Sequence, residues 1–186
     1  MTRKLPTISG GSGPRIQRHT GGVACIEVRD EEGELIAPDA VLDGVGNASI
    51  LIAREPFDTG SPETTLARLT ARGVRVILSP GFEAHFYQRC ISCGLLALPL
   101  EEEAVEALAE WAASRPDPVL TIDLDEQVIE RSGPDGEARS FAMDPRVRRK
   151  LLLGLTDEEE MLQHFSSTAA LRTEDRRRRP WLYDPR

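Results

Sequence analysis

The sequence predicts an α/β domain whose sheet is parallel in one part and antiparallel in another. Through residues 48–98, apolar strand-like runs alternate with helix-like segments, which predicts parallel strands joined by right-handed crossovers. Beyond residue 118, the strand candidates are separated by tight turns, which favours antiparallel or barrel-like pairing. Hydrophobic residues make up 40% of the 186 residues, which is enough for one buried core.

The elements of the parallel part follow from apolar runs and from glycines that end helices. Residues 48–53 (Ala-Ser-Ile-Leu-Ile-Ala) form a nearly unbroken apolar run, as expected of a strand buried on both faces. Gly73 and Gly94 each follow a helix candidate and are typical C-terminal stop signals. We expect strands at residues 22–28, 48–53, 74–78 and 95–98, and helices at residues 62–72, 82–93 and 101–114.

The later part of the chain carries clear turn and capping signals. Residues 132–136 (Ser-Gly-Pro-Asp-Gly) form a turn. Asp144 and Pro145 begin a helix as its N-cap and first residue. Thr156-Asp-Glu-Glu159 is a capping box that begins a last helix. Strand candidates in this part are residues 119–124, 127–129 and 140–143.

Charge and cysteine content narrow the possible partners and the compartment. The net charge of −8 argues against nucleic acid or an anionic membrane as the main partner, because both attract basic surfaces. The three cysteines do not suggest a disulfide framework. No run approaches the ~20 apolar residues of a membrane span. Residues 1–18 lack the apolar core of a secretory signal. We therefore expect a cytoplasmic protein.

We expect residues 1–18 to be a flexible N-terminal extension and residues 19–186 to form a single domain. Residues 9–14 (Ser-Gly-Gly-Ser-Gly-Pro) have the composition of a flexible linker. They are not a phosphate-binding loop, because no Gly-Lys-Ser/Thr follows them.

Several short segments occur in an order that matches one known family. The most informative is Gly81-Phe-Glu-Ala-His-Phe-Tyr87, which is followed by Cys90 and by Gly94-Leu-Leu. Weaker matches lie at residues 19–24, 36–38, 48–53, 141–145, 152–155, 163–164 and 179–182. Together they span roughly residues 19–183 and resemble the small subunit of 3-isopropylmalate dehydratase, a member of the aconitase superfamily.

This resemblance implies a swivelling β/β/α domain of the kind found in aconitase and in the dehydratase small subunit. It also implies a heterodimer or heterotetramer with a large subunit, which would carry a [4Fe-4S] cluster. This chain would bind no cofactor of its own and would be inactive alone. The implied reaction is that of a lyase, which isomerises a hydroxy-dicarboxylate by dehydration and rehydration in leucine biosynthesis or a related pathway.

The family's active-site motif, Gly-x-Gly-Ser-Ser-Arg-Glu, is only partly present. Its first serine removes a proton next to a carboxylate, and its arginine holds a carboxylate of the substrate. Here the segment after the apolar strand is Phe57-Asp-Thr-Gly-Ser-Pro-Glu-Thr64. The resemblance implies that Ser61 is catalytic and that Thr59, Gly60 and Ser61 contact the substrate. Pro62 replaces the second serine, and the arginine is missing.

The predicted site is therefore unusually acidic for a dicarboxylate substrate. Glu55 and Asp58 add negative charges next to the motif, and like charges repel a dianion. Arg54, Arg68 and Arg72 are the nearby residues that can replace the missing arginine. The segment between residues 38 and 48, where the family has a longer specificity loop, is also short.

A purely structural explanation accounts for the same motif. Ser61, Pro62 and Glu63 fit an N-cap, a first helical residue and an acid in the first turn. The two explanations are compatible, because a helix N-terminus also stabilises an alkoxide.

Other polar motifs are predicted to be structural. Cys90-Ile-Ser-Cys93 ends a helix instead of opening one, and no second pair completes a zinc site. The histidines are far apart in the sequence, and the arginine run has acidic neighbours. We therefore predict packing or surface roles for His19, His85, His164 and Arg176–Arg179.

Two functional hypotheses remain open from the sequence. In the first, the chain is the small subunit of a 3-isopropylmalate dehydratase-like enzyme and Ser61 takes part in catalysis. In the second, it is a catalytically degenerate swivel-domain protein with an assembly or regulatory role. Replacing Ser61 by alanine separates the two hypotheses.

Overall fold

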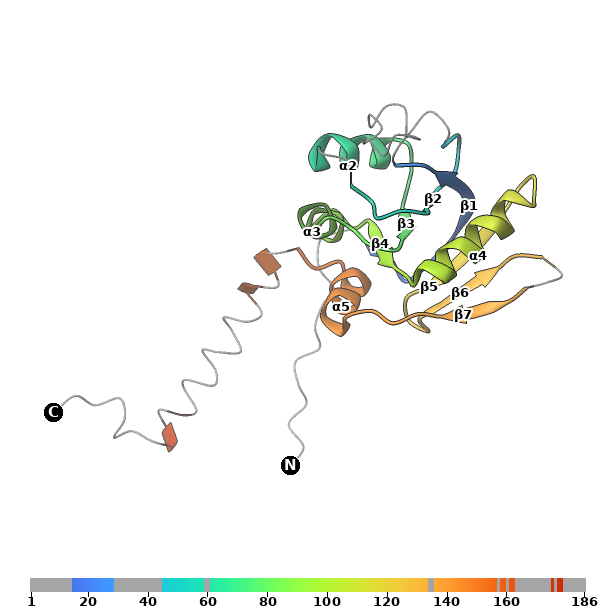
Figure 1. The fold of residues 1–186 in the computed structure, drawn as a ribbon. Helices are drawn as coiled ribbons and strands as arrows, with labels where there is room; N and C mark the ends of the chain where they lie inside the picture. The colour runs from blue at the N-terminus through green and yellow to red at the C-terminus, as the bar shows by residue number, and fades with distance from the viewer. Residues whose placement is uncertain are drawn as a thin grey trace.

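A single mixed sheet connects the two halves that the sequence predicts (Figure 1). In the computed structural model the strand order is β4-β3-β2-β1-β5-β6-β7. The strands are β1 (Arg18–Ile26), β2 (Ile50–Ala53), β3 (Val76–Ser79), β4 (Leu96–Pro99), β5 (Val119–Asp123), β6 (Val128–Arg131) and β7 (Ala138–Ser140). The helices are α2 (Pro62–Ala71), α3 (Ala84–Ser92), α4 (Glu102–Ala113) and α5 (Pro145–Leu153). The structure describes residues 15–28, 45–58, 61–133, 136–156, 158–159, 161–162, 175 and 177–178.

Strand β1 belongs to both halves of the sheet. Its first half, from Arg18 to Gly22, pairs antiparallel with β5. Its second half, from Val23 to Ile26, pairs parallel with β2. Strands β2, β3 and β4 are parallel, whereas β5, β6 and β7 are antiparallel. The predicted change from parallel to antiparallel pairing is therefore confirmed.

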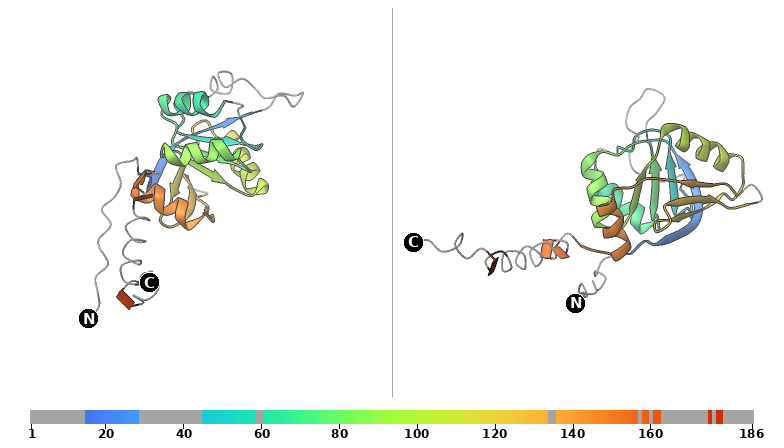
Figure 2. Two further views of the ribbon diagram at one scale, coloured as in Figure 1. Left: turned by 90° about the vertical axis from the view of Figure 1, so that its left-hand side faces the viewer. Right: turned by 90° about the horizontal axis from the view of Figure 1, so that it is seen from below.

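Helices cover both faces of the parallel half (Figure 2). Helices α2 and α3 lie on one face, and α4 lies on the other. Ile50 and Ile52 of β2 pack in the α4 cluster, whereas Leu51 and Ala53 pack in the α2 and α3 cluster. All four residues of β2 are fully buried, which confirms the interpretation of the apolar run at residues 48–53.

The predicted stop and capping signals occupy the expected positions. Gly73 and Gly94 have φ values of +84° and +69°, which glycine adopts without strain. The Asp144 side chain accepts a hydrogen bond from the Arg146 N–H at 2.7 Å. In the capping box, Glu159 N–H donates to Thr156 Oγ1 and Thr156 N–H donates to Glu159 Oε2. These three local predictions are confirmed.

Two boundaries differ from the prediction. The fold begins before residue 19, because Ile16 is buried and its N–H donates to Leu151 O at 3.1 Å. Strand β1 starts at Arg18 instead of residue 22, because β5 supplies an antiparallel partner back to Asp123. Sequence patterns miss this pairing because the glycine-containing stretch has little strand propensity. The linker at residues 9–14 lies outside the described residues.

None of the helices in the described part of the chain is long and apolar enough to cross a membrane.

The junction of the two sheet halves predicts a steric constraint at Gly21. A Cβ at Gly21 would lie 1.8 Å from Ser49 Oγ and 3.2 Å from Ser49 Cβ. The Ser49 hydroxyl is held there by His19 Nε2 at 2.9 Å. We expect Gly21→Ala to lower the free energy of unfolding by about 1–3 kcal/mol, as overpacking usually does, measured by urea denaturation.

The neighbouring glycine provides the control. A Cβ at Gly22 would lie 4.0 Å from its nearest neighbouring atom. Gly22→Ala should therefore lower the free energy of unfolding clearly less than Gly21→Ala does. The double variant Gly21→Ala/Ser49→Gly should recover part of the loss. Equal effects of the two alanine substitutions would contradict the steric explanation.

Candidate functional site

Ser61 stands at the N-terminus of α2, beyond the carboxyl end of β2. It is the N-cap residue of α2, with φ −139° and ψ 78°, and its side chain is exposed. Its carbonyl accepts the first helical hydrogen bond, from the Thr65 N–H at 3.1 Å. Thr59 and Gly60, the other predicted substrate contacts, lie outside the described residues.

The Ser61 hydroxyl is not used to cap the helix. It donates to Thr64 Oγ1 at 3.2 Å and makes no hydrogen bond to a backbone N–H of α2. The predicted cap position is confirmed, as are Pro62 in the first turn and Glu63 as its acidic residue. The capping explanation therefore accounts for the position of Ser61 but not for its hydroxyl group.

A buried serine ties together the loops that follow β2 and β3. Ser79 Oγ lies 3.0 Å from Glu55 O and 2.6 Å from Gly81 O, and its single proton serves one carbonyl at a time. It also accepts a hydrogen bond from the Phe57 N–H at 3.2 Å. Ser79 is completely buried at the end of β3. The sequence analysis missed it, although a polar residue that ends an apolar strand is a usable signal.

Aromatic packing holds the same two loops together. Phe57 is fully buried, with its ring centroid 4.9 Å from that of Phe86 on α3. Its backbone forms an isolated parallel bridge with Phe82, in which Phe57 N–H donates to Gly81 O at 2.8 Å. The connection that leads to Ser61 is therefore fixed at Phe57 by both its backbone and its side chain.

Glu83 is the N-cap of α3 and places a carboxylate at the N-terminus of this helix. Its two carboxylate oxygens accept hydrogen bonds from the His85 N–H at 2.8 Å and the Phe86 N–H at 2.7 Å. These bonds favour the ionised form, so they hold the pKa of Glu83 below its ordinary value. Because the Glu83 carboxylate already accepts from these two N–H groups, they are not available to bind an anionic ligand.

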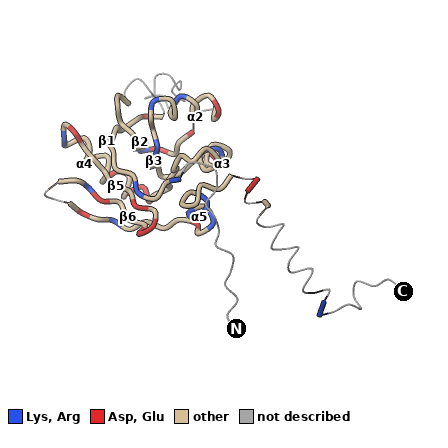
Figure 3. Tube along the Cα trace, turned by 180° about the vertical axis from the view of Figure 1, so that it is seen from behind, with Lys and Arg blue, Asp and Glu red and all other residues tan. Residues whose placement is uncertain are grey.

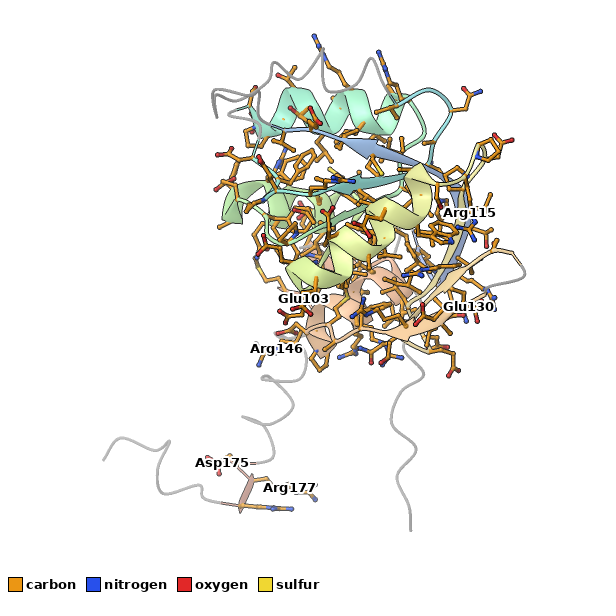
Figure 4. The ribbon with its side chains drawn as sticks, turned by 45° about the vertical axis from the view of Figure 1, so that its right-hand side comes forward. Glu103, Arg115, Glu130, Arg146, Asp175 and Arg177 are labelled. Atoms are coloured by element: carbon orange, nitrogen blue, oxygen red, sulfur yellow. The ribbon has the colours of Figure 1, made fainter. Side chains whose placement is uncertain are left out.

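The carboxyl end of the parallel strands is an acidic edge. Glu63 lies in the first turn of α2, and Glu102 and Glu103 lie in the first turn of α4. Figure 3 shows acidic residues at one end of α2 and basic residues at the other. Figure 4 shows Glu103 at the start of α4, at the opposite end from Arg115. Helix dipoles explain this distribution, because carboxylates stabilise N-terminal turns.

The three arginines that the sequence offers as replacements lie in different places. Arg54 directly follows β2 and forms an ion pair with Glu106 of α4, with Nη1 3.2 Å from Oε1. Arg68 lies in the last turn of α2, and Arg72 is its C-cap. A ten-residue helix is about 15 Å long, and both arginines lie toward the opposite end of α2 from Ser61.

The cysteines and histidines are dispersed over the described residues. Cys90 is buried inside α3, which raises the pKa of its thiol, whereas Cys93 is the exposed C-cap of that helix. The predicted position of this pair at a helix end is confirmed. Burial and the nearby Arg75 lower the pKa of His19, which bonds Ser49. His85 is exposed, and His164 lies outside the described residues.

A cavity of about 550 Å³ lies away from Ser61. It is bounded by the second half of β1, the C-terminal end of α4 and residues 45–48. Ser61 itself is exposed at the N-terminus of α2.

Comparisons with known proteins agree with the resemblance seen in the sequence. No family model matches the chain. The chain is 36% identical over 148 residues to the 3-isopropylmalate dehydratase small subunit of Methylibium petroleiphilum, covering 78% of this chain and 68% of that protein. It is 37% identical over 143 residues to the small subunit of the same name from Rhodopirellula baltica, covering 75% and 72%.

A solved structure supports the fold alone. The crystal structure of a 3-isopropylmalate dehydratase from Methanocaldococcus jannaschii matches with a TM-score of 0.52 at 13% sequence identity. The match covers 83% of this chain and 99% of that chain. The mixed α/β architecture is therefore the one that the sequence predicts.

The Ser79 contacts predict that removing one hydroxyl loosens two loops. We expect Ser79→Ala to lower the free energy of unfolding by about 1–3 kcal/mol, because buried polar groups lose their partner. Amide exchange at Phe57 should become faster. Ser140→Ala, at an exposed position of β7, should change stability by less than about 0.5 kcal/mol. An unchanged exchange rate at Phe57 would exclude the proposed link between the loops.

The Glu83 cap predicts an acid-sensitive contribution to stability. Because folding lowers the pKa of Glu83 from its ordinary value, this contribution is complete above the unfolded pKa and disappears as the pH falls through the folded pKa. The melting temperature of Glu83→Gln should therefore lie below that of the wild type at pH 7, with the difference shrinking in acid. Glu101→Gln is the matched control, since Glu101 is an N-cap residue without a side-chain cap bond; at pH 7 it should lower the melting temperature less than Glu83→Gln does.

Proposed function

Because this chain belongs to the family of 3-isopropylmalate dehydratase small subunits, we propose that it completes the active site of a hydro-lyase formed with a large subunit. The reaction is the isomerisation of a hydroxy-dicarboxylate by loss and re-addition of water, in leucine biosynthesis or a related pathway. The observation that carries this proposal is the exposed Ser61 hydroxyl at the start of α2, which is not used to cap the helix.

The local structure suits Ser61 as the group that moves a proton. In the dehydration direction, its oxygen takes a proton from the carbon next to a carboxylate. The electron pair of that C–H bond forms the double bond as the C–O bond of the neighbouring hydroxyl group breaks. We propose that an acid of the large subunit protonates the departing hydroxyl group to give water, and that Ser61 later returns its proton to solvent. An alkoxide is a favourable base only where fixed dipoles stabilise it, and the N-terminus of α2 provides such a dipole. Thr59 and Gly60 remain proposed substrate contacts beside Ser61.

The partner supplies what this chain lacks. Ser61 is exposed in this chain, and we propose that the large subunit covers it in a heterodimer or heterotetramer. We also propose that the [4Fe-4S] cluster belongs to the large subunit. The cysteines of this chain do not fit a cluster, because Cys90 is buried with a raised thiol pKa and Cys25 lies on another element. The three free thiols suit a cytoplasmic, reducing location.

Reconstitution tests the proposed function. The chain is co-expressed with the large subunit of the same organism, kept anaerobic, and assayed for dehydration of 3-isopropylmalate. Turnover that requires both chains is the expected result. A stable complex that turns over neither 3-isopropylmalate nor related hydroxy-dicarboxylates would instead favour the degenerate swivel-domain protein with an assembly or regulatory role.

The role of Ser61 predicts a defect confined to catalysis. Ser61→Ala should reduce kcat by at least about 100-fold, as expected for loss of a group that transfers the proton. The variant should still elute with the large subunit in size-exclusion chromatography, because the hydroxyl makes no cap bond. Ser132→Ala, in an exposed turn, serves as the control and should keep wild-type turnover. Retained activity in Ser61→Ala would remove Ser61 from the mechanism.

A further inference from the structure

The connection between β2 and α2 contains one cation, at the opposite end from Ser61. Residues 54–61 include Arg54 and no other lysine or arginine. Arg54 follows the last residue of β2, and Ser61 precedes the first residue of α2. The Arg54 side chain contacts Glu106 of α4 on one face of the sheet, whereas α2, which Ser61 begins, packs on the other face.

Arg54 is held by a partner that a ligand can replace. Its Nη1 lies 3.2 Å from Glu106 Oε1, and the two side chains are 48% and 46% exposed. An exposed ion pair of this kind is weak, because water screens both charges. A ligand carboxylate that reaches the guanidinium can therefore displace Glu106, whose carboxylate then returns to water.

The residues on both sides of Arg54 are held in place, which fixes the position from which its side chain extends. Ala53 is fully buried at the end of β2. On the other side, the carbonyl of Glu55 lies 3.0 Å from the buried Ser79 hydroxyl, and the Phe57 N–H is bound by both Ser79 and Gly81. Such an anchor lowers the ordering cost of binding a ligand.

A carboxylate that enters this edge needs a cation. Glu55, Glu63 and Glu83 lie around the loops and helix starts that frame it, and each repels an anion. A guanidinium binds a carboxylate through two parallel N–H bonds, which a single ammonium cannot match. Arg68 and Arg72 do not offer this contact, because they lie at the far end of α2.

We propose that Arg54 binds a carboxylate of the substrate while Ser61 acts at the adjacent carbon, and that Glu106 holds the guanidinium when the site is empty. This inference rests on the proposed function. It assigns one end of the connection to a substrate carboxylate and the other end to the carbon next to that carboxylate. It also makes Glu106 a competitor of the substrate, so that removing its charge should strengthen substrate binding.

The test is steady-state kinetics of the reconstituted complex with 3-isopropylmalate. Arg54→Ala should raise KM about 10- to 100-fold, as expected for loss of a charged hydrogen bond, with a smaller change in kcat. Arg54→Lys should recover only part of this loss. Glu106→Gln should lower KM about 2- to 5-fold, since exposed pairs are weak competitors. Size-exclusion chromatography with the large subunit checks that each variant assembles.

Arg18→Ala is the matched control. It breaks an exposed ion pair, in which Arg18 Nη2 lies 3.0 Å from Glu130 Oε2 and the side chains are 58% and 48% exposed. Figure 4 places Glu130 on the antiparallel half, away from the start of α4 marked by Glu103. This variant should keep the wild-type KM.

The outcomes separate this inference from the proposed function. A wild-type complex that turns over, with KM unchanged in both Arg54→Ala and Glu106→Gln, overturns the role of Arg54 and leaves the proposed function standing. A wild-type complex without turnover overturns both. If Arg54→Ala does not assemble with the large subunit, the other two variants provide the test. A raised KM in Arg54→Lys together with a lowered KM in Glu106→Gln supports the role of Arg54. Wild-type KM values in both variants reject it.

Discussion

The structure depends on β1 pairing in two directions at once. Its first half bonds antiparallel to β5 and its second half bonds parallel to β2, so one strand joins the parallel and antiparallel halves of a single sheet. The change takes place at Gly21 and Gly22, where Ser49 N–H donates to Gly22 O and Val23 N–H donates to Pro118 O. The lack of side chains there lets Ser49 approach β1 closely enough to bond His19. Residues of both halves, such as Ile50 and Leu120, then pack with α4 in one core cluster.

The position of the candidate site follows from that arrangement. Four parallel strands end at one edge, where the connections to α2, α3 and α4 begin. Ligands of open α/β sheets bind beyond the carboxyl ends of the strands, because helix N-termini and loops converge there. Ser79 and Phe57 make the two central loops one rigid unit. Arg54 directly follows β2 and its side chain contacts α4, whereas Ser61 begins α2 on the other face of the sheet.

The electrostatics of this edge set the conditions for its chemistry. Helix starts favour acidic residues, and here Glu63, Glu83 and Glu102 occupy them. The same carboxylates that stabilise the helices repel a dicarboxylate. The proposed dicarboxylate substrate would therefore need compensating cations, either from the proposed large subunit or from Arg54. The ion pair between Arg54 and Glu106 keeps a guanidinium at the edge without fixing it permanently.

Local patterns in the sequence determined most of the fold. The apolar run at residues 48–53, the glycines after α2 and α3, and the Asp144 and Thr156 caps act over a few residues, and each is found as predicted. The family-like segments likewise identified Ser61 and its place at a helix start. Only the tertiary structure decided contacts between residues distant in sequence. These contacts are the antiparallel extension of β1, the link from Ser79 to Glu55, and the ion pair between Arg54 and Glu106. The structure likewise decided that Arg68 and Arg72 lie at the far end of α2 from Ser61. Such contacts depend on which strands lie side by side, and no local pattern encodes that order.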